Sequence, residues 1–224
     1  MSIAGFFSGL FGGGNGSNPQ GKNADILKNA RQAKPTCPPA PDAAPSGKQL
    51  ATFAGGCFWG LELAYQRVPG VIKTSVGYTG GHDPTPNYNS VCSGRTGHAE
   101  AVQVVYDPQE VQYEQLLDTF FQHVDPTTKD RQGGDRGTQY RSAIYCHTPE
   151  QKAVAQKAIE QVNKQLAEGS FRRVAGKKVV SELEDATMYY VAEPYHQQYL
   201  SRGGRFGFGQ SAEKGATEKI RCYG

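Results

Sequence analysis

One cysteine of the chain lies in a setting that suits thiol chemistry. Cys57 stands in the stretch Gly55-Gly56-Cys57-Phe58-Trp59-Gly60, where an apolar run ends and helical spacing begins. Unpaired N–H groups at a helix N-terminus stabilise a thiolate, and a lowered thiol pKa is the usual route to a reactive cysteine. Phe58 and Trp59 would form an apolar wall for a methyl or thioether group. A buried structural cysteine fits the same spacing, so position alone leaves both interpretations open.

Alternating strand and helix patterns surround this cysteine. The apolar patterns predict helices over 58–68, 113–123 and 149–167, and strands over 50–54, 71–78, 99–106, 142–146 and part of 179–191. This alternation predicts an α/β fold, a two-layer α/β sandwich with a ferredoxin-like core, in which helices cover one sheet. Glycine recurs from Gly203 onward, so we expect an irregular Gly-rich C-terminal tail.

The composition divides the chain in two. Residues 1–48 are rich in Gly, Pro, Asn, Ser and Ala, which predicts a flexible extension because so little apolar surface is available for burial. Residues 49–224 are expected to form the catalytic domain. A chain of 224 residues can bury a core without disulfides or a structural metal.

Charge and cysteine usage exclude several classes of protein. The net charge is only +3 and the basic residues are scattered, which argues against nucleic-acid binding. No apolar run is long enough to span a membrane. Five cysteines at irregular spacings, with no Cys-x-x-Cys pair and five dispersed histidines, indicate free thiols and no metal site. We expect a cytoplasmic monomer, with a plastid or another organelle as the alternative compartment.

Further blocks of sequence follow Cys57 and carry a resemblance to a known family. Together with Gly-Cys-Phe-Trp-Gly they resemble the A-type peptide methionine sulfoxide reductases, in family order, over roughly residues 49–224. The ending Ile220-Arg221-Cys222-Tyr223-Gly224 resembles plant and other eukaryotic-type members. The other blocks are Gly77-Tyr78-Thr79-Gly80-Gly81, Asn87-Tyr88, Val91-Cys92-Ser93-Gly94, Thr96-Gly97-His98-Ala99-Glu100, Gly134-Asp135-Arg136-Gly137-Thr138-Gln139-Tyr140-Arg141-Ser142 and Tyr195-His196-Gln197-Gln198-Tyr199-Leu200.

The resemblance implies an oxidoreductase that reduces the S epimer of methionine sulfoxide, peptide-bound or free, and so repairs oxidised proteins. A sulfoxide sulfur becomes electrophilic only when its oxygen is protonated or strongly hydrogen-bonded. An enclosed site would raise the pKa of the acid and keep it protonated. The implied roles are Cys57 as nucleophile, Glu100 as acid, Tyr88 and Tyr140 as hydroxyl donors, Asp135 as a polar residue of the same pocket, and Phe58 and Trp59 as the substrate's methyl pocket.

The same resemblance implies how Cys57 is regenerated. Attack on the sulfoxide leaves a sulfenic acid, which condenses readily with a second thiol. Cys222 matches that partner, and an external thioredoxin would reduce the disulfide by exchange, with no bound cofactor. Plant-type relatives usually carry another cysteine where this chain has Ala216, after Gly215. We therefore expect a single Cys57–Cys222 disulfide.

Other interpretations compete with this one. A thiol peroxidase or cysteine hydrolase would also use Cys57, but a hydrolase needs a histidine partner, and no histidine stands in a recognisable nucleophile context. A non-catalytic module could bind methionine sulfoxide or a peptide through the aromatic pair, although binding requires neither Glu100 nor Cys222. Residue by residue, Glu100 could be an exposed strand carboxylate, Asp135 a turn residue and His196 a structural histidine.

Overall fold

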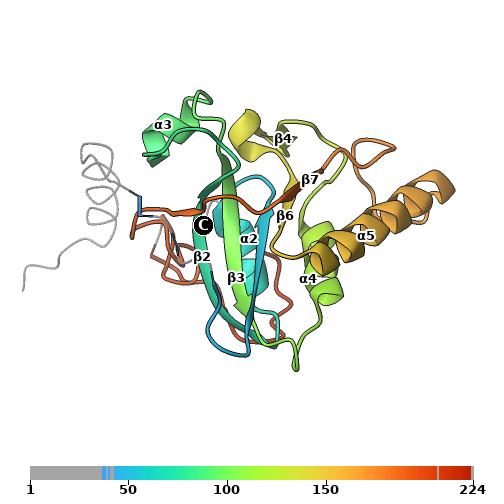
Figure 1. The fold of residues 1–224 in the computed structure, drawn as a ribbon, viewed down its shortest axis with the longest axis horizontal. Helices are drawn as coiled ribbons and strands as arrows, with labels where there is room; N and C mark the ends of the chain where they lie inside the picture. The colour runs from blue at the N-terminus through green and yellow to red at the C-terminus, as the bar shows by residue number, and fades with distance from the viewer. Residues whose placement is uncertain (1–36, 39, 41–42, 206, 223–224) are drawn as a thin grey trace, which may run out of the picture.

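The computed structural model describes residues 37–38, 40, 43–205 and 207–222. Six strands form one mixed sheet in the order β7-β6-β1-β3-β2-β8 (Figure 1). The strands of this sheet are β1 (Gln49–Ala54), β2 (Val71–Thr79), β3 (Ala99–Tyr106), β6 (Ala143–Cys146), β7 (Glu182–Asp185) and β8 (Tyr190–Val191). The helices are α2 (Phe58–Gln66), α3 (Tyr88–Cys92), α4 (Tyr113–His123) and α5 (Pro149–Glu168). A small hairpin pairs β4 (Arg131–Gln132) with β5 (Asp135–Arg136) and precedes a 3₁₀ turn, Thr138–Tyr140.

Four central strands and two helices make the ferredoxin-like core. They follow one another as β1, α2, β2, β3, α4 and β6, and the spatial order is β6-β1-β3-β2 with every neighbouring pair antiparallel. This is the split β-α-β arrangement, in which each helix connects two parallel strands and an antiparallel strand lies between them. The predicted α/β sandwich with a ferredoxin-like core is therefore confirmed.

Helices α2, α4 and α5 pack on one face of the sheet. Val102 and Val104 point from β3 into this core, beside Leu116 and Phe120 of α4. The ring of Phe53 lies 5.7 Å from that of Phe120. Burying aliphatic and aromatic side chains stabilises the fold by roughly 1.5–3 kcal/mol each, and this layer holds α2 firmly against the sheet.

The opposite face of the sheet is crossed by the chain itself. Residues 186–189 run from β7 at one edge to β8 at the other, and Figure 1 shows this orange-to-red segment passing over the strands. Three alanines lie in register beneath it, because Ala54 pairs with Ala101 on one side and with Ala143 on the other. Their small side chains leave room for the crossing segment, which packs Tyr189 against them.

The prediction of at least one strand within 179–191 is confirmed, and the segment forms two short strands separated by this crossing. Two elements were not predicted: α3 and the β4–β5 hairpin both lie in segments for which the sequence predicted neither helix nor strand. Asn87 explains the first, because its side chain accepts a hydrogen bond from the Ser90 N–H while Ser90 bonds back to Asn87, a capping box. None of the helices that the structure describes is long and apolar enough to cross a membrane.

Of the segment expected to be a flexible extension, the structure describes residues 37–38, 40 and 43–48, and the rest lies outside the described part. Cys37 is buried in the helix-side core. The Ala40 N–H donates to the Tyr189 carbonyl at 2.8 Å, and the Val191 N–H donates to the Pro38 carbonyl at 3.0 Å. This part of the predicted extension packs against the crossing segment and β8.

Candidate active site

Cys57 lies at the junction of β1 and α2. Two glycines make the turn, and Gly56 has a φ of +76°, a conformation that side chains disfavour. A Cβ on Gly55 would lie 2.4 Å from a methyl carbon of Val124, so the close approach also requires glycine there. Cys57 is the N-cap residue of α2, half-buried. The sequence prediction of a cysteine at a helix N-terminus is confirmed.

Seven of the eight residues that the sequence analysis selected surround one small pocket of about 70 Å³. They come from four separate parts of the chain: the start of α2, the start of α3, the strand β3, and the β5 hairpin with its following 3₁₀ turn. They are Cys57, Phe58, Trp59, Tyr88, Glu100, Asp135 and Tyr140. The eighth, Cys222, does not line this pocket and lies next to Gly60 of α2.

Glu100 points from β3 toward the N-terminus of α2. Its side chain is buried, and its Oε2 accepts a hydrogen bond of 3.1 Å from the Phe58 N–H. Burial raises the pKa of this carboxyl to about 8, with a further raising contribution from the charge of Asp135. The acid therefore holds its proton at neutral pH, and an exposed strand carboxylate is the wrong interpretation.

The electrostatics of Cys57 differ from the sequence expectation. Burial raises the pKa of the thiol above its usual value, and Glu100 raises it further only when its carboxyl group is ionised. The Trp59 N–H lowers the pKa, as a helix N-terminus should, but its effect is the smaller one. The expected lowered pKa is wrong for the resting site. Because Glu100 is protonated there, its contribution is absent until it gives its proton away.

The two tyrosines present neutral hydroxyl groups to the pocket. Burial raises the pKa of both Tyr88 and Tyr140. Each phenol therefore remains a hydrogen-bond donor. The position of Tyr88 is fixed by Glu193, whose Oε1 accepts its N–H at 2.9 Å. Glu193 was not among the residues predicted from the sequence, although it stands just before the Tyr195–Leu200 block.

The aromatic wall is less symmetrical than expected. Phe58 is buried in the helix-side core, whereas Trp59 is half-exposed and stacks on Tyr199 with ring centroids 3.8 Å apart. The Trp59 Nε1 donates to Nδ1 of His196 at 3.2 Å. Burial lowers the pKa of His196 to about 3, so the imidazole is neutral and supports the wall. His196 is therefore better interpreted as a structural histidine than as a base of the pocket.

Cys222 reaches α2 from the C-terminal tail. A Cβ on Gly60 would lie only 2.5 Å from the Cys222 Sγ, so the missing side chain of Gly60 makes room for this thiol. Residues three apart share one face of a helix, which places Cys222 next to the face that carries Cys57. The thiols of Cys57 and Cys222 are both free. Of the remaining cysteines, Cys92 contacts the Tyr88 hydroxyl, a link to the pocket that sequence reasoning did not assign.

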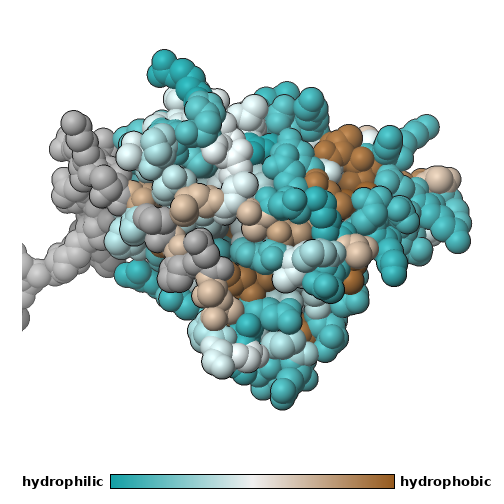
Figure 2. Space-filling view, viewed as in Figure 1, coloured by the Kyte–Doolittle hydropathy of each residue, from teal (hydrophilic) through white to brown (hydrophobic). Residues whose placement is uncertain are grey.

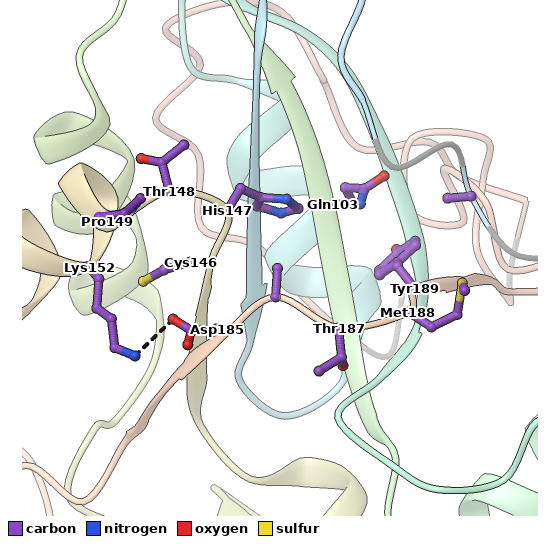
Figure 3. Close-up of a pocket in the computed structure, with 12 residues that line it drawn as sticks. Gln103, Cys146, His147, Thr148, Pro149, Lys152, Asp185, Thr187, Met188 and Tyr189 are labelled. Atoms are coloured by element: carbon purple, nitrogen blue, oxygen red, sulfur yellow. Dashed lines mark hydrogen bonds and ion pairs between the residues drawn. The ribbon is translucent and has the colours of Figure 1, made fainter.

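A larger cavity, of about 740 Å³, lies elsewhere, beside the crossing segment (Figure 3). It contains a cysteine followed by a histidine, but Figure 3 shows the side chains of Cys146 and His147 pointing in different directions. The His147 Nε2 lies 2.8 Å from the Thr52 hydroxyl. The cavity holds no residue that the sequence analysis selected. Among the described residues, no group of three or more His, Cys, Asp or Glu side chains could hold a metal ion.

An α/β sandwich with a thiol, a protonated carboxylic acid and two phenols around one small pocket defines a thiol enzyme acting on a compact polar group. The model of the family "Peptide methionine sulfoxide reductase" matches residues 49–221. The chain belongs to this family and is an oxidoreductase that reduces methionine sulfoxide.

Individual relatives agree with this assignment. The chain is 54% identical, over 186 residues, to "Peptide methionine sulfoxide reductase A4, chloroplastic" of Arabidopsis thaliana, an alignment covering 83% of this chain and 69% of that protein. Methionine sulfoxide reductase A of Corynebacterium diphtheriae superposes with a TM-score of 0.62 at 41% identity, covering 70% of this chain and 75% of the other. Reduced Mxr1 of Saccharomyces cerevisiae superposes with a TM-score of 0.63 at 33% identity, covering 76% and 92%.

Proposed function

We propose that the pocket reduces the S epimer of methionine sulfoxide, free or in oxidised proteins, with Cys57 as the nucleophile. The observation that carries this proposal is the convergence of a buried carboxylic acid and two neutral phenols on one thiol. The hydroxyls of Tyr88 and Tyr140 bind the sulfoxide oxygen, and Asp135 completes the polar side of the pocket. Phe58 and Trp59 accommodate the substrate's methyl group.

Glu100 couples proton transfer to nucleophilic attack. It donates its proton to the sulfoxide oxygen, which makes the substrate sulfur electrophilic. The resulting carboxylate recovers a proton from the Cys57 thiol as the sulfur of Cys57 attacks. The oxygen passes to Cys57, which becomes a sulfenic acid and is oxidised by two electrons, while the substrate is reduced to methionine.

Cys222 then regenerates the enzyme. Its sulfur attacks the sulfenic sulfur of Cys57, the S–O bond breaks, and water leaves with the thiol proton, so that a Cys57–Cys222 disulfide remains. We propose that thioredoxin reduces this disulfide by thiol exchange and that no resident cofactor is used. Support for the pairing comes from the free Cys222 thiol next to the helix face of Cys57.

The proposal extends to the setting in which the enzyme works. We propose a monomer that binds neither nucleic acid nor membrane, in the cytoplasm or in a plastid. The name of the Arabidopsis relative, which contains "chloroplastic", supports the plastid. A fluorescent fusion of the full chain, expressed in plant cells, would separate the two compartments.

An assay with separated epimers tests the chemistry. The enzyme, thioredoxin and thioredoxin reductase are mixed with either the S or the R sulfoxide of a blocked methionine, and methionine formation is followed by chromatography. We expect turnover of the S epimer only, because each epimer requires its own enzyme. Turnover of the R epimer alone would overturn the proposal. The structure gives a cysteine hydrolase no support, since no histidine lines the pocket.

A further inference from the structure

The C-terminal tail is fastened to the far end of the helix that carries Cys57. Arg67, the residue that ends α2, is buried and makes three contacts with the tail. Its Nε donates to the Ser211 carbonyl at 2.9 Å and its Nη1 to the Glu218 carbonyl at 2.5 Å. Its Nη2 lies 3.7 Å from the Glu218 carboxylate. The tail is irregular, but its path over α2 is specified.

The tail in turn contributes a cation, Lys214, that contacts the end of α2. The Lys214 Nζ donates to the Gln66 carbonyl at 2.8 Å and to the Val71 carbonyl at 2.6 Å. The neighbouring Gly215 N–H donates to the Arg67 carbonyl at 2.7 Å. The last carbonyls of a helix carry partial negative charge and lack partners within the helix, so an ammonium group is stabilised there.

The side chain of Gln210 joins the two ends of the tail segment 210–221, because it bonds to the backbone of Arg221. The buried amide of Gln210 donates to the Arg221 carbonyl at 2.8 Å and accepts the Arg221 N–H at 2.9 Å. Cys222 follows immediately and lies against Gly60. The helix end, the tail and the second thiol therefore form one connected arrangement.

We propose that Arg67 and Lys214 are positioning residues for the resolving step, fixing the tail so that Cys222 meets the sulfenic acid on Cys57. This inference rests on the proposed function. In that step the Cys222 sulfur bonds to the Cys57 sulfur, and the Cys57 hydroxyl leaves as water with the Cys222 proton. The substrate has already departed as methionine, so neither positioning residue touches it.

The fixed path of the tail takes the place of a relay through a second tail cysteine. A chain with another tail cysteine could pass the disulfide outward along a mobile segment, but this chain has Ala216 after Gly215. Holding two reactants in place raises their effective concentration by large factors, and small displacements lose most of that gain. The planar guanidinium of Arg67 suits this task because it donates to two carbonyls in fixed directions while its charge lies near the Glu218 carboxylate.

A single turnover without reductant separates the two steps. Wild-type enzyme, Arg67→Met and Lys214→Met are each mixed with methionine sulfoxide, and the methionine formed is measured at short times. The disulfide is measured in parallel by alkylation of remaining thiols and mass spectrometry, and the sulfenic acid is trapped with dimedone. Lys164→Met serves as the control, because Lys164 is an exposed lysine of α5 far from the tail in sequence.

We expect both variants to release methionine at the wild-type rate. Formation of the Cys57–Cys222 disulfide should slow by roughly tenfold to a hundredfold in Arg67→Met and by less in Lys214→Met, with dimedone adduct accumulating. Arg67→Lys should recover only part of the rate, since it keeps the positive charge but loses the planar guanidinium with its several N–H donors. Lys164→Met should behave as wild type.

Two results would overturn the inference: an unchanged disulfide rate in both variants, or equal slowing of methionine release and disulfide formation. Circular dichroism checks folding, and the exposed Lys214 offers a test that does not disturb a buried side chain. Failure of the proposed function looks different. In that case Cys222→Ser in an otherwise wild-type chain would still form an intramolecular disulfide at the normal rate.

Discussion

Two cysteines of this molecule lie where a strand of the sheet leads into a helix. Cys57 follows β1 and caps α2, while Cys146 ends β6 shortly before α5. Cys146 borders a cavity of about 740 Å³, and Cys57 borders one of about 70 Å³. Burial raises the pKa of both thiols.

The difference lies in what surrounds each sulfur. Around Cys57, a protonated carboxyl and two phenols converge on a space that fits a small polar group. Around Cys146 the cavity is wider, and the neighbouring histidine points elsewhere (Figure 3). The face of the molecule drawn in Figure 2, which is the one facing the viewer in Figure 1, shows separate apolar patches with polar side chains between them. Convergent donors, and not cavity size, therefore identify the site.

The largest expected effect separates the two thiols directly. Cys57→Ser should abolish methionine formation, because a serine hydroxyl is a far weaker nucleophile than a thiol and cannot form the sulfenic acid. Cys146→Ser should keep activity within about twofold and cost roughly 1 kcal/mol of stability, since it buries a hydroxyl. Chromatography of methionine and thermal unfolding measure the two outcomes. An active Cys57→Ser enzyme would contradict the mechanism.

The second-largest effect on activity is expected for substitution of Glu100. Glu100→Gln should lower kcat by roughly a hundredfold to ten-thousandfold, the usual contribution of a positioned proton donor. In the wild-type enzyme kcat should fall above about pH 8, where Glu100 loses its proton, and Glu100→Gln should lack that limb. Glu62→Gln is the matched control, because Glu62 is also buried with a pKa raised to about 7, but it does not line the pocket. Equal losses in both variants would remove the special role of Glu100.

The phenols should contribute less. Tyr140→Phe and Tyr88→Phe should each lower kcat/KM about tenfold, the loss expected for one hydrogen bond to a developing charge. Tyr145→Phe is the control: Tyr145 is buried on the opposite face of the sheet, where Arg141 donates to its hydroxyl at 3.1 Å. That variant should lose stability and keep its activity. A Tyr145→Phe enzyme as impaired as Tyr140→Phe would indicate a general loss of packing.

Much of this comparison follows from sequence patterns. The turn at Gly56 and the helical spacing after Cys57 place the thiol at a helix N-terminus, and the alternation in β3 marks a strand around Glu100. The family blocks selected the seven residues of the pocket. The pattern could not decide which face of β3 was buried most deeply, because both faces of this strand are covered, one by helices and one by residues 186–189.

Other features depend on contacts between distant segments, which no local pattern encodes. The raised pKa of Cys57 results from burial, and the pocket beside the thiol is completed by Tyr88 of α3 and Asp135 of β5. The approach of Cys222 to Gly60 joins positions far apart in the chain. The capping role of Asn87 was readable in principle, since Asn followed three residues later by Ser can form a reciprocal cap, but the surrounding Gly and Pro favoured a loop.

The last expected effect concerns stability and has the opposite sign to the effect on activity. The folded chain raises the Glu100 pKa from 4.5 to about 8, so the unfolded chain ionises first as the pH rises. The stability linked to this proton is fully present below about pH 4.5 and is lost as the pH rises through 8. Glu100→Gln removes the group that must ionise while buried. A shift of this size is worth up to about 5 kcal/mol, so the Tm of the variant should exceed the wild-type value by roughly 10 °C or more at about pH 9 and match it below about pH 4.5.

Asp185→Asn in the larger cavity provides the contrasting measurement. Asp185 pairs with Lys152 at 2.8 Å, but both side chains are exposed, so water screens the pair and its loss should shift the Tm little at either pH. Thermal unfolding of the three proteins at the two pH values makes the test. A Glu100→Gln enzyme no more stable than wild type at high pH would show that the folded chain accommodates the carboxylate at little cost. Glu100 would then be ionised at neutral pH and unable to act as the acid, so the feature that separates the pocket at Cys57 from the cavity at Cys146 would be lost.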